Sequence, residues 1–414
     1  MGRTAHGGRL RLSLPWPITS LDPASLDDGF SALFAAAAFE PLYALDGNGV
    51  PYPALADALP TPHGEGARLA LRPGLRTAAG RALTGADVVA TLARARSRGA
   101  AGALGDIEAP TLDRKDPLAV VFARATPDAV ARALASPLTA LVPRGFSPLA
   151  PDGCGAFKVE LAQGRALLTR NTNAARGAAF LDAIEVTSVS DLAELLRAFE
   201  AGAADVGWFG SGLYRAGKDA VPFEAPLYGF AVLAAGKSLG GWGAPGTLQA
   251  LLDAVPAQQL AHLGLRGLPA GSRAPAAWGG PATSLAVAAH APQLVAIARA
   301  LAATFSRPGH ELSVVEKTRE ELVALRGSRQ FGLLLDVVRA PSNAPRELEL
   351  ALRTAASPEG AKRAPHTTPV TPRALGRQLP MGVVGELSVH GARRSAFQGL
   401  EAWQLGAVAW RATT

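Results

Sequence analysis

Three aspartates stand where predicted β-strands end, and a carboxylate at such a position can contact a ligand. Asp22, Asp205 and Asp336 each lie at or just past the end of an apolar or alternating segment. Open α/β sheets bind their ligands beyond the carboxyl ends of strands, so these acids are candidate ligand contacts. Helix capping or a salt bridge within the fold also explains a strand-end acid, and we favour that interpretation for any one of them taken alone.

The cysteine and histidine content gives no support for covalent or metal chemistry. Cys154, the single cysteine, lies between two glycines in a predicted tight turn, and we interpret it as a small turn residue rather than a nucleophile. One cysteine excludes an internal disulfide and a cysteine-based zinc or iron–sulfur site. The seven histidines are widely spaced, so an HExxH pair is absent from the sequence. We therefore predict no catalytic residue, no metal site and no cofactor.

Two glycine-rich stretches resemble nucleotide-binding loops, but each lacks a required feature. The segment GFAVLAAGKS (229–238) has Ala231 where a phosphate-binding loop needs glycine. The spacing G-x-G-x-x-G occurs at 241–246, but the preceding strand ends too early and Pro245 occupies a spacer position. A G-x-S-x-G nucleophile elbow is also missing from the sequence. Neither nucleotide binding nor hydrolase chemistry is favoured.

The composition is that of a globular chain with room for two or three domains. Of its 414 residues 48% are hydrophobic and 18% are charged, and the formal net charge is +7. The basic residues are scattered and only 6% of residues are aromatic, so no nucleic-acid partner is expected. No run approaches the roughly 20 apolar residues of a membrane span. The start MGRTAHGGRL lacks the apolar core of a signal peptide, so either the protein is cytosolic or a leader has been removed.

The helices and strands that would position these residues are predicted from the spacing of apolar residues and from proline and helix-capping residues. Alternation predicts a strand over Arg9–Trp16, and Asp22 before Pro23 predicts a helix that ends at Pro41. Thr84 and Asp87 have capping-box spacing, which predicts a helix within Leu83–Arg96.

Further along, a β-hairpin is predicted over Gly155–Asn171, followed by a β-α-β unit that ends in ADVGWFG (204–210). A β-α-β-α-β run is predicted over 285–338. Such an order predicts parallel sheets, and the chain is expected to be a multi-lobed α/β protein.

An ordered series of short motifs resembles one family, the extracellular (periplasmic) solute-binding proteins of family 5, the dipeptide, oligopeptide and nickel-binding class of ABC transporters. The motifs are TSLDPA (19–24), FEPLYALDGNGVPYPALAD (39–57), LRPGLRTAAGRALTGADVVATLARA (71–95), GCGAFKV (153–159), TRNTNAARGAAFLDAIEV (169–186), AFEAGAADV (198–206) and LQALLDAVP (248–256). Their order and spacing carry the resemblance, which spans most of residues 9–255.

The resemblance implies an α/β fold of the type II periplasmic-binding-protein kind, in which two lobes with mixed sheets flanked by helices surround a ligand cleft. The expected division is a first lobe over 1–225, with 41–150 as a peripheral subdomain, and a second lobe over 226–380. Residues 381–414 are expected to return to the first lobe. The hinge is expected near Ala225–Ala234 and at the return before Met381.

The resemblance also implies a function and a place in the cell. The protein is expected to be no enzyme but the monomeric binding component of an ABC importer, delivering a small or peptide ligand to a permease in the inner membrane. Family members begin near a GG-x-L motif, as Gly7–Leu12 does, which implies a removed leader and a location in the periplasm or at the outer face of the membrane. The expected ligand contacts fall at predicted strand ends or hinges: Ser20, Asp22, Trp208, Gly210, Ser211, Tyr228 and Asp336.

Two departures from the family pattern leave the ligand open. Peptide binders of the family hold the peptide's amino terminus with an aspartate after the strand that corresponds to 331–338, but here RAPSNAPRE (339–347) has no acid before Glu347. The helix LQALLDAVP also lacks the family's arginine and closing aspartate. These departures motivate a second hypothesis, ranked below the importer: a degenerate binding fold that acts as a sensor or protein-interaction module. A third, an enzyme on the same scaffold, would have to use Cys154, Asp205 or Asp336.

Overall fold

The fold is described from a computed structural model. It describes residues 7–14, 18, 20–26, 29–189, 192–208, 220–263, 265–267, 277–341, 344–357, 370–395, 397–398 and 411–412.

The chain forms two lobes joined by two long strands. The elements of the first lobe are β1 (Arg9–Leu14), α1 (Gly29–Ala38), β2 (Tyr43–Leu45), β3 (Pro51–Pro53), β4 (Thr61–His63), β5 (Gly66–Ala70), α2 (Gly85–Arg96), α3 (Ala101–Leu104), β6 (Thr111–Leu112), β7 (Ala119–Phe122), α4 (Pro127–Ala133), the 3₁₀ helix η1 (Pro137–Thr139), β8 (Phe157–Ala162), β9 (Arg165–Arg170), β10 (Ala183–Ser188), α5 (Leu192–Glu200) and β11 (Val206–Trp208). The elements of the second lobe are the 3₁₀ helix η2 (Lys237–Gly243), α6 (Thr247–Asp253), α7 (Ala257–Ala261), β13 (Leu265–Arg266), β14 (Thr283–Ala288), α8 (Pro292–Phe305), β15 (Leu312–Lys317), α9 (Arg319–Ser328), β16 (Leu333–Arg339), α10 (Pro345–Ala356) and α12 (Pro372–Gly376). The long strands are β12 (Ala220–Ala235) and β17 (Met381–Arg394), and the short strands β18 (Phe397–Gln398) and β19 (Arg411–Ala412) pair with each other.

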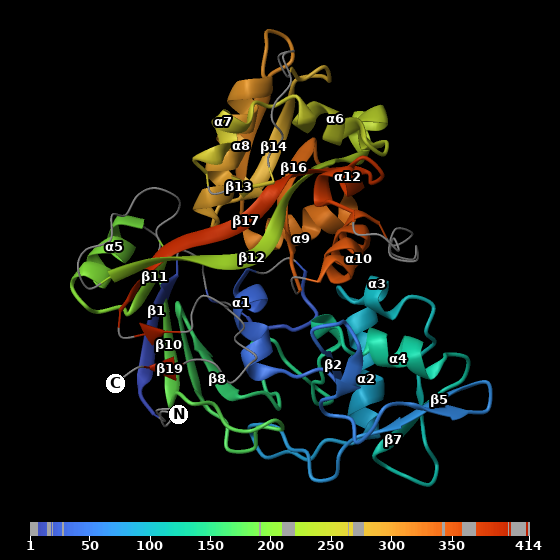
Figure 1. The fold of residues 1–414 in the computed structure, drawn as a ribbon. Helices are drawn as coiled ribbons and strands as arrows, with labels where there is room; N and C mark the ends of the chain where they lie inside the picture. Colours follow the sequence, from blue (N-terminus) through green and yellow to red (C-terminus); the bar gives the residue numbers. More distant parts are fainter. Residues whose placement is uncertain are drawn as a thin grey trace.

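One mixed sheet continues from the second lobe into the first. Within the described residues its strands follow the order β15-β14-β16-β12-β17-β11-β1-β10-β9-β8, with β13 paired to β17. Figure 1 shows β12 and β17 running side by side from the part of the molecule that holds β1 and β10 to the part that holds β14 and β16. The antiparallel register between them shifts between Ala225 and Gly229 and again between Ala231 and Val232. Such irregularities let a strand pair bend.

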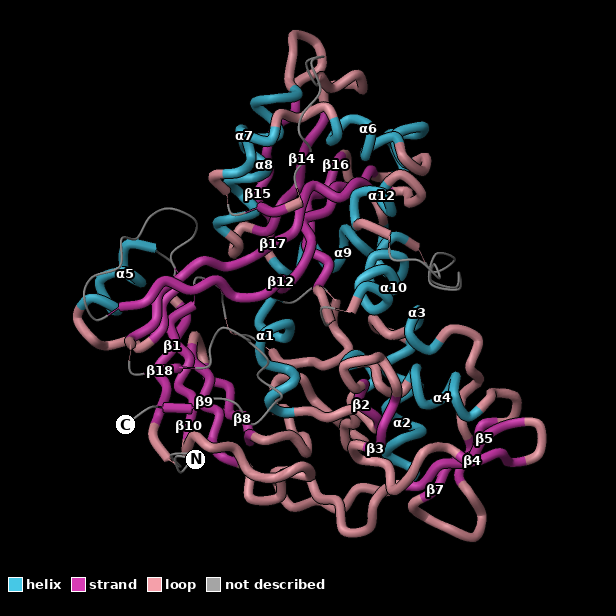
Figure 2. Tube along the Cα trace, viewed as in Figure 1, coloured by secondary structure: helices cyan, strands magenta, loops and turns pink. Residues whose placement is uncertain are grey.

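A peripheral unit extends the first lobe. It comprises β2 to η1, and its four-stranded sheet has the order β4-β5-β7-β6. Figure 2 shows β4, β5 and β7 of this sheet at the right of the view. Its core is separate from that of the large sheet and includes Leu69, Val88, Leu92 and Val130. The segment 41–150 thus has its own apolar centre, while the lobe boundaries expected from the sequence stay a prediction.

Most predicted elements are present. The hairpin over Gly155–Asn171 is confirmed as β8 and β9, and both predicted β-α-β runs form parallel pairs, of β1 with β10 and β11 and of β14 with β15 and β16. The predicted helix start at Asp22 is wrong, because α1 begins at Gly29. Asp22 instead closes a turn, accepting the Ala24 amide, and its carboxylate pairs with an arginine of α2. Among the described residues, none of the helices is long and apolar enough to cross a membrane.

Candidate ligand site

A cavity of about 550 Å³ lies between the two lobes. The first lobe contributes the segment Asp22–Leu26, apart from its proline, and the end of α2. The second lobe contributes β16 and the carboxyl ends of α9 and α10, and the long strands complete the lining. The lining residues are Asp22, Ala24, Ser25, Leu26, Ser97, Arg98, Val232, Ala234, Arg326, Arg329, Phe331, Leu334, Asp336, Val337, Val338, Thr354, Ala355, Ala356, Ser357, Pro380 and Met381.

Asp22 lines the cavity from the first lobe, but its carboxylate already forms an ion pair with an arginine. Arg94 on α2 donates from Nη1 and Nη2 to its two carboxylate oxygens at 2.9 and 2.5 Å. The Asp22 amide donates to the Ser31 hydroxyl at 2.9 Å, which ties the segment to α1. The side chain is therefore a fixed structural ion pair at the edge of the cavity, of the charge-assisted, bidentate kind.

Asp336 lines the same cavity from the second lobe and is neutralised in the same way. Arg326 on α9 donates from Nε and Nη2 to its two carboxylate oxygens at 2.6 and 2.7 Å. Asp336 also accepts the Val337 amide at 2.9 Å. The structure thus brings Asp22 and Asp336, which are more than 300 residues apart in the chain, to one cavity, each with a partner of its own lobe.

The other predicted ligand residues are placed differently. Ser20 is buried outside the cavity lining, and its hydroxyl accepts a hydrogen bond from Nη2 of Arg319 on α9 at 3.0 Å. Gly210 and Ser211 lie outside the described residues, as do the side chains of Trp208 and Tyr228. Their role in ligand binding stays a prediction.

A buried arginine that was not among the predicted contacts begins the stretch 339–347. Arg339, the last residue of β16, is 2% exposed, and its Nη1 donates to the carbonyls of Pro23 at 2.9 Å and Ser25 at 3.1 Å. Its amide donates to the Leu26 carbonyl at 2.7 Å. The lack of an acid before Glu347 was visible in the sequence, but no signal showed that a buried guanidinium would hold the 22–26 segment against the second lobe.

A second contact between the lobes involves a buried acid of α10. Glu347 accepts a hydrogen bond from the Ser136 hydroxyl at 2.6 Å, across 211 residues of chain. Burial raises the pKa of Glu347 above its ordinary value, and only the hydrogen bond from Ser136 and the charge of Arg346 act against it. Nearby, the Gly102 amide of α3 donates to the Thr354 hydroxyl of α10 at 3.2 Å.

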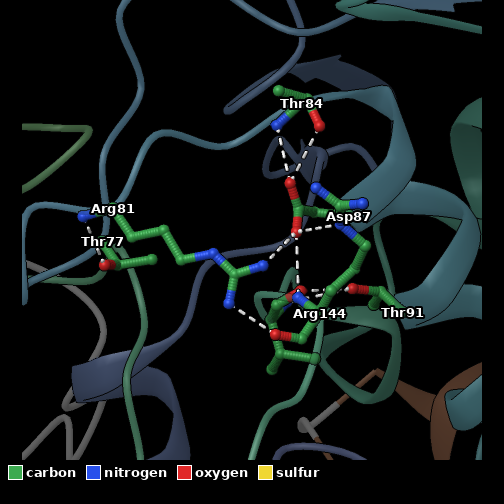
Figure 3. A network of polar contacts seen from close by, with 7 residues as sticks. Thr77, Arg81, Thr84, Asp87, Thr91 and Arg144 are labelled. Atoms are coloured by element: carbon green, nitrogen blue, oxygen red, sulfur yellow. Dashed lines mark hydrogen bonds and ion pairs between the residues drawn. The ribbon is translucent and has the colours of Figure 1, made fainter.

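The residues T-G-A-D-V (84–88), within the motif over 71–95, have a structural role (Figure 3). Asp87, fully buried, accepts the amide and hydroxyl of Thr84 at 2.9 and 3.0 Å and the amide of Arg144 at 2.9 Å. Burial alone would raise the pKa of Asp87, but these hydrogen bonds together hold it below its ordinary value. The predicted capping box is confirmed, and it also fastens the loop that carries Arg144 to the start of α2.

The residues on which an enzyme would depend are engaged or inaccessible. Cys154 is fully buried, and burial raises the pKa of its thiol to about 12, far from that of a reactive thiolate. Asp205 forms a salt bridge with Arg11 at 2.7 Å and accepts the Arg11 amide. Among the described residues, no group of three or more potential metal ligands comes together.

The fold and its interlobe cavity define a class, the two-lobed binding proteins, and comparison with known proteins supports the resemblance found in the sequence. Residues 50–220 match the model of the bacterial extracellular solute-binding proteins, family 5, middle region. No curated protein sequence matches the chain at a significant level.

Solved structures of binding proteins share the fold over almost the whole chain. The oligopeptide-binding protein AppA of Bacillus subtilis, in complex with a nonapeptide, is 13% identical with a TM-score of 0.71, and the match covers 100% of both chains. DppA of Helicobacter pylori, in complex with the peptide STSA, is 13% identical with a TM-score of 0.72, covering 99% of both. AgaA of A. tumefaciens R10, in complex with agropinic acid, is 16% identical with a TM-score of 0.70, covering 98% of both. The resemblance and the fold class predicted from the sequence are confirmed.

Proposed function

We propose that this protein is the substrate-binding component of an ABC importer, which captures a small ligand between its lobes and works in the periplasm or at the outer face of the membrane. The observation that carries the proposal is the cavity of about 550 Å³ lined by both lobes, a volume suited to a small molecule. Binding would close the lobes over the ligand without covalent chemistry, and the closed form would be delivered to a permease. The protein is proposed to act as a monomer without a nucleic-acid partner.

The connection between the lobes supports hinge closure. In the described part of the chain, β12 and β17 form the continuous strand connection, and their register shifts at Ala225/Gly229 and Ala231/Val232. A two-stranded ribbon that contains such irregularities bends more readily than a regular sheet. The shifts fall within or beside the hinge that the sequence predicts at Ala225–Ala234.

The test is mass spectrometry of the purified protein, first under native conditions and then after denaturation. A compound of defined mass released on denaturation is the expected result. Returned to the emptied protein at a hundredfold excess over Kd, the compound should raise the free energy of unfolding by about 2.7 kcal/mol. A protein that carries no compound and is not stabilised by peptide, sugar or metal panels would contradict capture of a small ligand.

One observation favours a second candidate, a degenerate binding fold that serves as a sensor or interaction module. Buried contacts already join the lobes, Arg339 to the carbonyls of Pro23 and Ser25 and Glu347 to Ser136. Buried polar contacts of this kind resist separation, because opening leaves each group without its partner until water replaces it. Small-angle X-ray scattering distinguishes the two functions: a capture protein becomes more compact when its ligand is added, whereas a locked module keeps one radius of gyration.

A further inference from the structure

Among the described residues, the charges that line the cavity do not balance. The two carboxylates of the lining, Asp22 and Asp336, are each held by an arginine of the same lobe, Arg94 and Arg326. Two further arginines line the cavity, Arg98 and Arg329. In the part of the chain that the structure describes, neither of these two guanidinium groups has a carboxylate within ion-pair distance.

The unbalanced arginines come from opposite sides of the cavity. Arg98 follows the carboxyl end of α2 in the first lobe, and Arg329 caps the carboxyl end of α9 in the second, with a left-handed backbone (φ 55°). A helix carboxyl end carries only about half a negative charge, so it offsets part of a guanidinium charge and leaves the rest. Each lobe therefore presents excess positive charge to the space between them.

This arrangement discriminates among ligands by charge. Approach of the lobes brings two positive charges together while water is expelled, and their repulsion grows as the local dielectric falls. A cationic ligand would add to this repulsion. A peptide's ammonium group would also need a carboxylate, but both carboxylates of the lining are occupied, and the end of β16 carries Arg339 instead of an acid. An anion is the ligand whose charge both arginines attract.

We propose that the cavity takes a small organic anion, with carboxylate or phosphate oxygens held by Arg98 from one lobe and by Arg329 from the other. Guanidinium groups bind both kinds of oxyanion in a planar, two-point manner. Because the anion is attracted from both lobes, it favours the closed arrangement that the two arginines otherwise oppose. This inference rests on the proposed function, capture of a ligand between the lobes.

The test uses a small-molecule extract of bacterial cells, divided by ion exchange into anionic, cationic and uncharged or zwitterionic fractions. Each fraction is added to the emptied full-length protein, and the shift of the melting temperature is measured. Three variants are compared with the wild type: Arg98→Gln, Arg329→Gln and, as a control with the same charge change, Arg114→Gln. Arg114 is exposed and does not line the cavity. A cooperative unfolding transition in the absence of extract shows that each variant is folded.

The expected result is stabilisation of the wild type by the anionic fraction alone, and of Arg114→Gln to the same degree. Compounds retained from that fraction are then identified by mass spectrometry, which separates carboxylates from phosphates. Arg98→Gln and Arg329→Gln should each bind the retained compound about ten- to a hundredfold more weakly, the usual effect of losing one charged hydrogen-bonding partner. Arg329→Lys should recover part of the affinity.

Different experimental outcomes distinguish failure of the anion proposal from failure of the proposed function, ligand capture between the lobes. Stabilisation by the cationic or the uncharged fraction would overturn the anion proposal and leave capture between the lobes standing. So would binding of an anion that is unaffected by both cavity variants. No stabilisation by any fraction would overturn the proposed function, and the anion proposal with it.

Discussion

Two helices of this protein carry a buried acid at the same position, the third residue of the helix, and use it in opposite ways. In α2, Asp87 returns to its own N-cap, Thr84, and completes a network within the first lobe. In α10, the N-cap is Ala344, which has no side-chain acceptor, and Glu347 extends to Ser136 of the other lobe. The contrast shows how an identical local position serves either the stability of one lobe or the contact between two.

The difference extends to protonation. Several hydrogen-bond donors face Asp87, so its pKa is lowered despite burial, whereas burial dominates at Glu347 and raises its pKa. Asp87 therefore contributes stability above the unfolded-state pKa of aspartate, about 3.9, and this contribution is lost as the pH falls toward the lower folded-state value. Glu347 has the opposite sign. Its contribution is complete below about pH 4.3 and is lost as the pH rises through its raised folded-state pKa.

The largest effect is expected for Asp87→Ala. The substitution leaves the Arg144 amide and the N-cap of α2 without their acceptor, and it should lower the free energy of unfolding by about 3 kcal/mol, as loss of a buried charged partner does. Urea unfolding measures the change. Asp128→Ala, on the exposed face of α4, removes a surface ion pair with Arg132 and should cost less than about 1 kcal/mol. Equal losses in the two variants would show that the network around Asp87 adds nothing.

Glu347→Gln should have a smaller effect that depends on pH. Glutamine retains an oxygen for the Ser136 hydroxyl but does not titrate, so the variant should lose the acid-side gain of the wild type and equal or exceed its stability above neutral pH. Between pH 4 and 8, the difference in free energy of unfolding between wild type and variant should change by about 1 kcal/mol, the size of one buried hydrogen bond. Urea unfolding between pH 4 and 8 measures it, with Glu320→Gln on the exposed start of α9 as control. Parallel pH profiles for wild type and Glu347→Gln would contradict the role given to this acid.

The smallest effect, a gain, is expected for Ala344→Ser. The backbone of Ala344 is already extended (φ −71°, ψ 124°), so serine can cap α10 without rearrangement and should add about 0.5–1 kcal/mol. A capping serine also offers Glu347 the partner that Thr84 offers Asp87. Thermal unfolding measures the gain, and Thr84→Ala should produce the mirror loss in α2. A destabilised Ala344→Ser protein would mean that the two helix starts are not comparable.

Much of the fold could be predicted because its signals are local. The capping box at Thr84 and Asp87, the hairpin over Gly155–Asn171 and the apolar strands of the second lobe depend on neighbours within a few residues, and all appear in the structure. The start of α1 could not be predicted in this way. Asp22 has the local pattern of a helix cap, but Arg94, 72 residues away, binds its carboxylate.

The candidate site could be predicted only in part, for the same reason. Asp22 and Asp336 both line the cavity, but the predicted strand ends are wrong: β1 already ends at Leu14, and Asp336 lies in the middle of β16. Their neutralisation by Arg94 and Arg326 and the charge left on Arg98 and Arg329 depend on which helices pack beside the cavity. Arg339 is the clearest case, since its partners are backbone carbonyls more than 300 residues away, and a carbonyl has no signature in a sequence.

The pairing of β12 with β17 has a topological consequence. The chain enters the second lobe along one strand and leaves it along its hydrogen-bonded neighbour, with Ala225 opposite Val389, so the points of entry and exit are about 5 Å apart. The second lobe is therefore an insertion between two neighbouring strands, and a tight turn that joined β12 directly to β17 could replace it. If the second lobe is lengthened, trimmed or exchanged, the two strands that connect it to the first lobe keep their places.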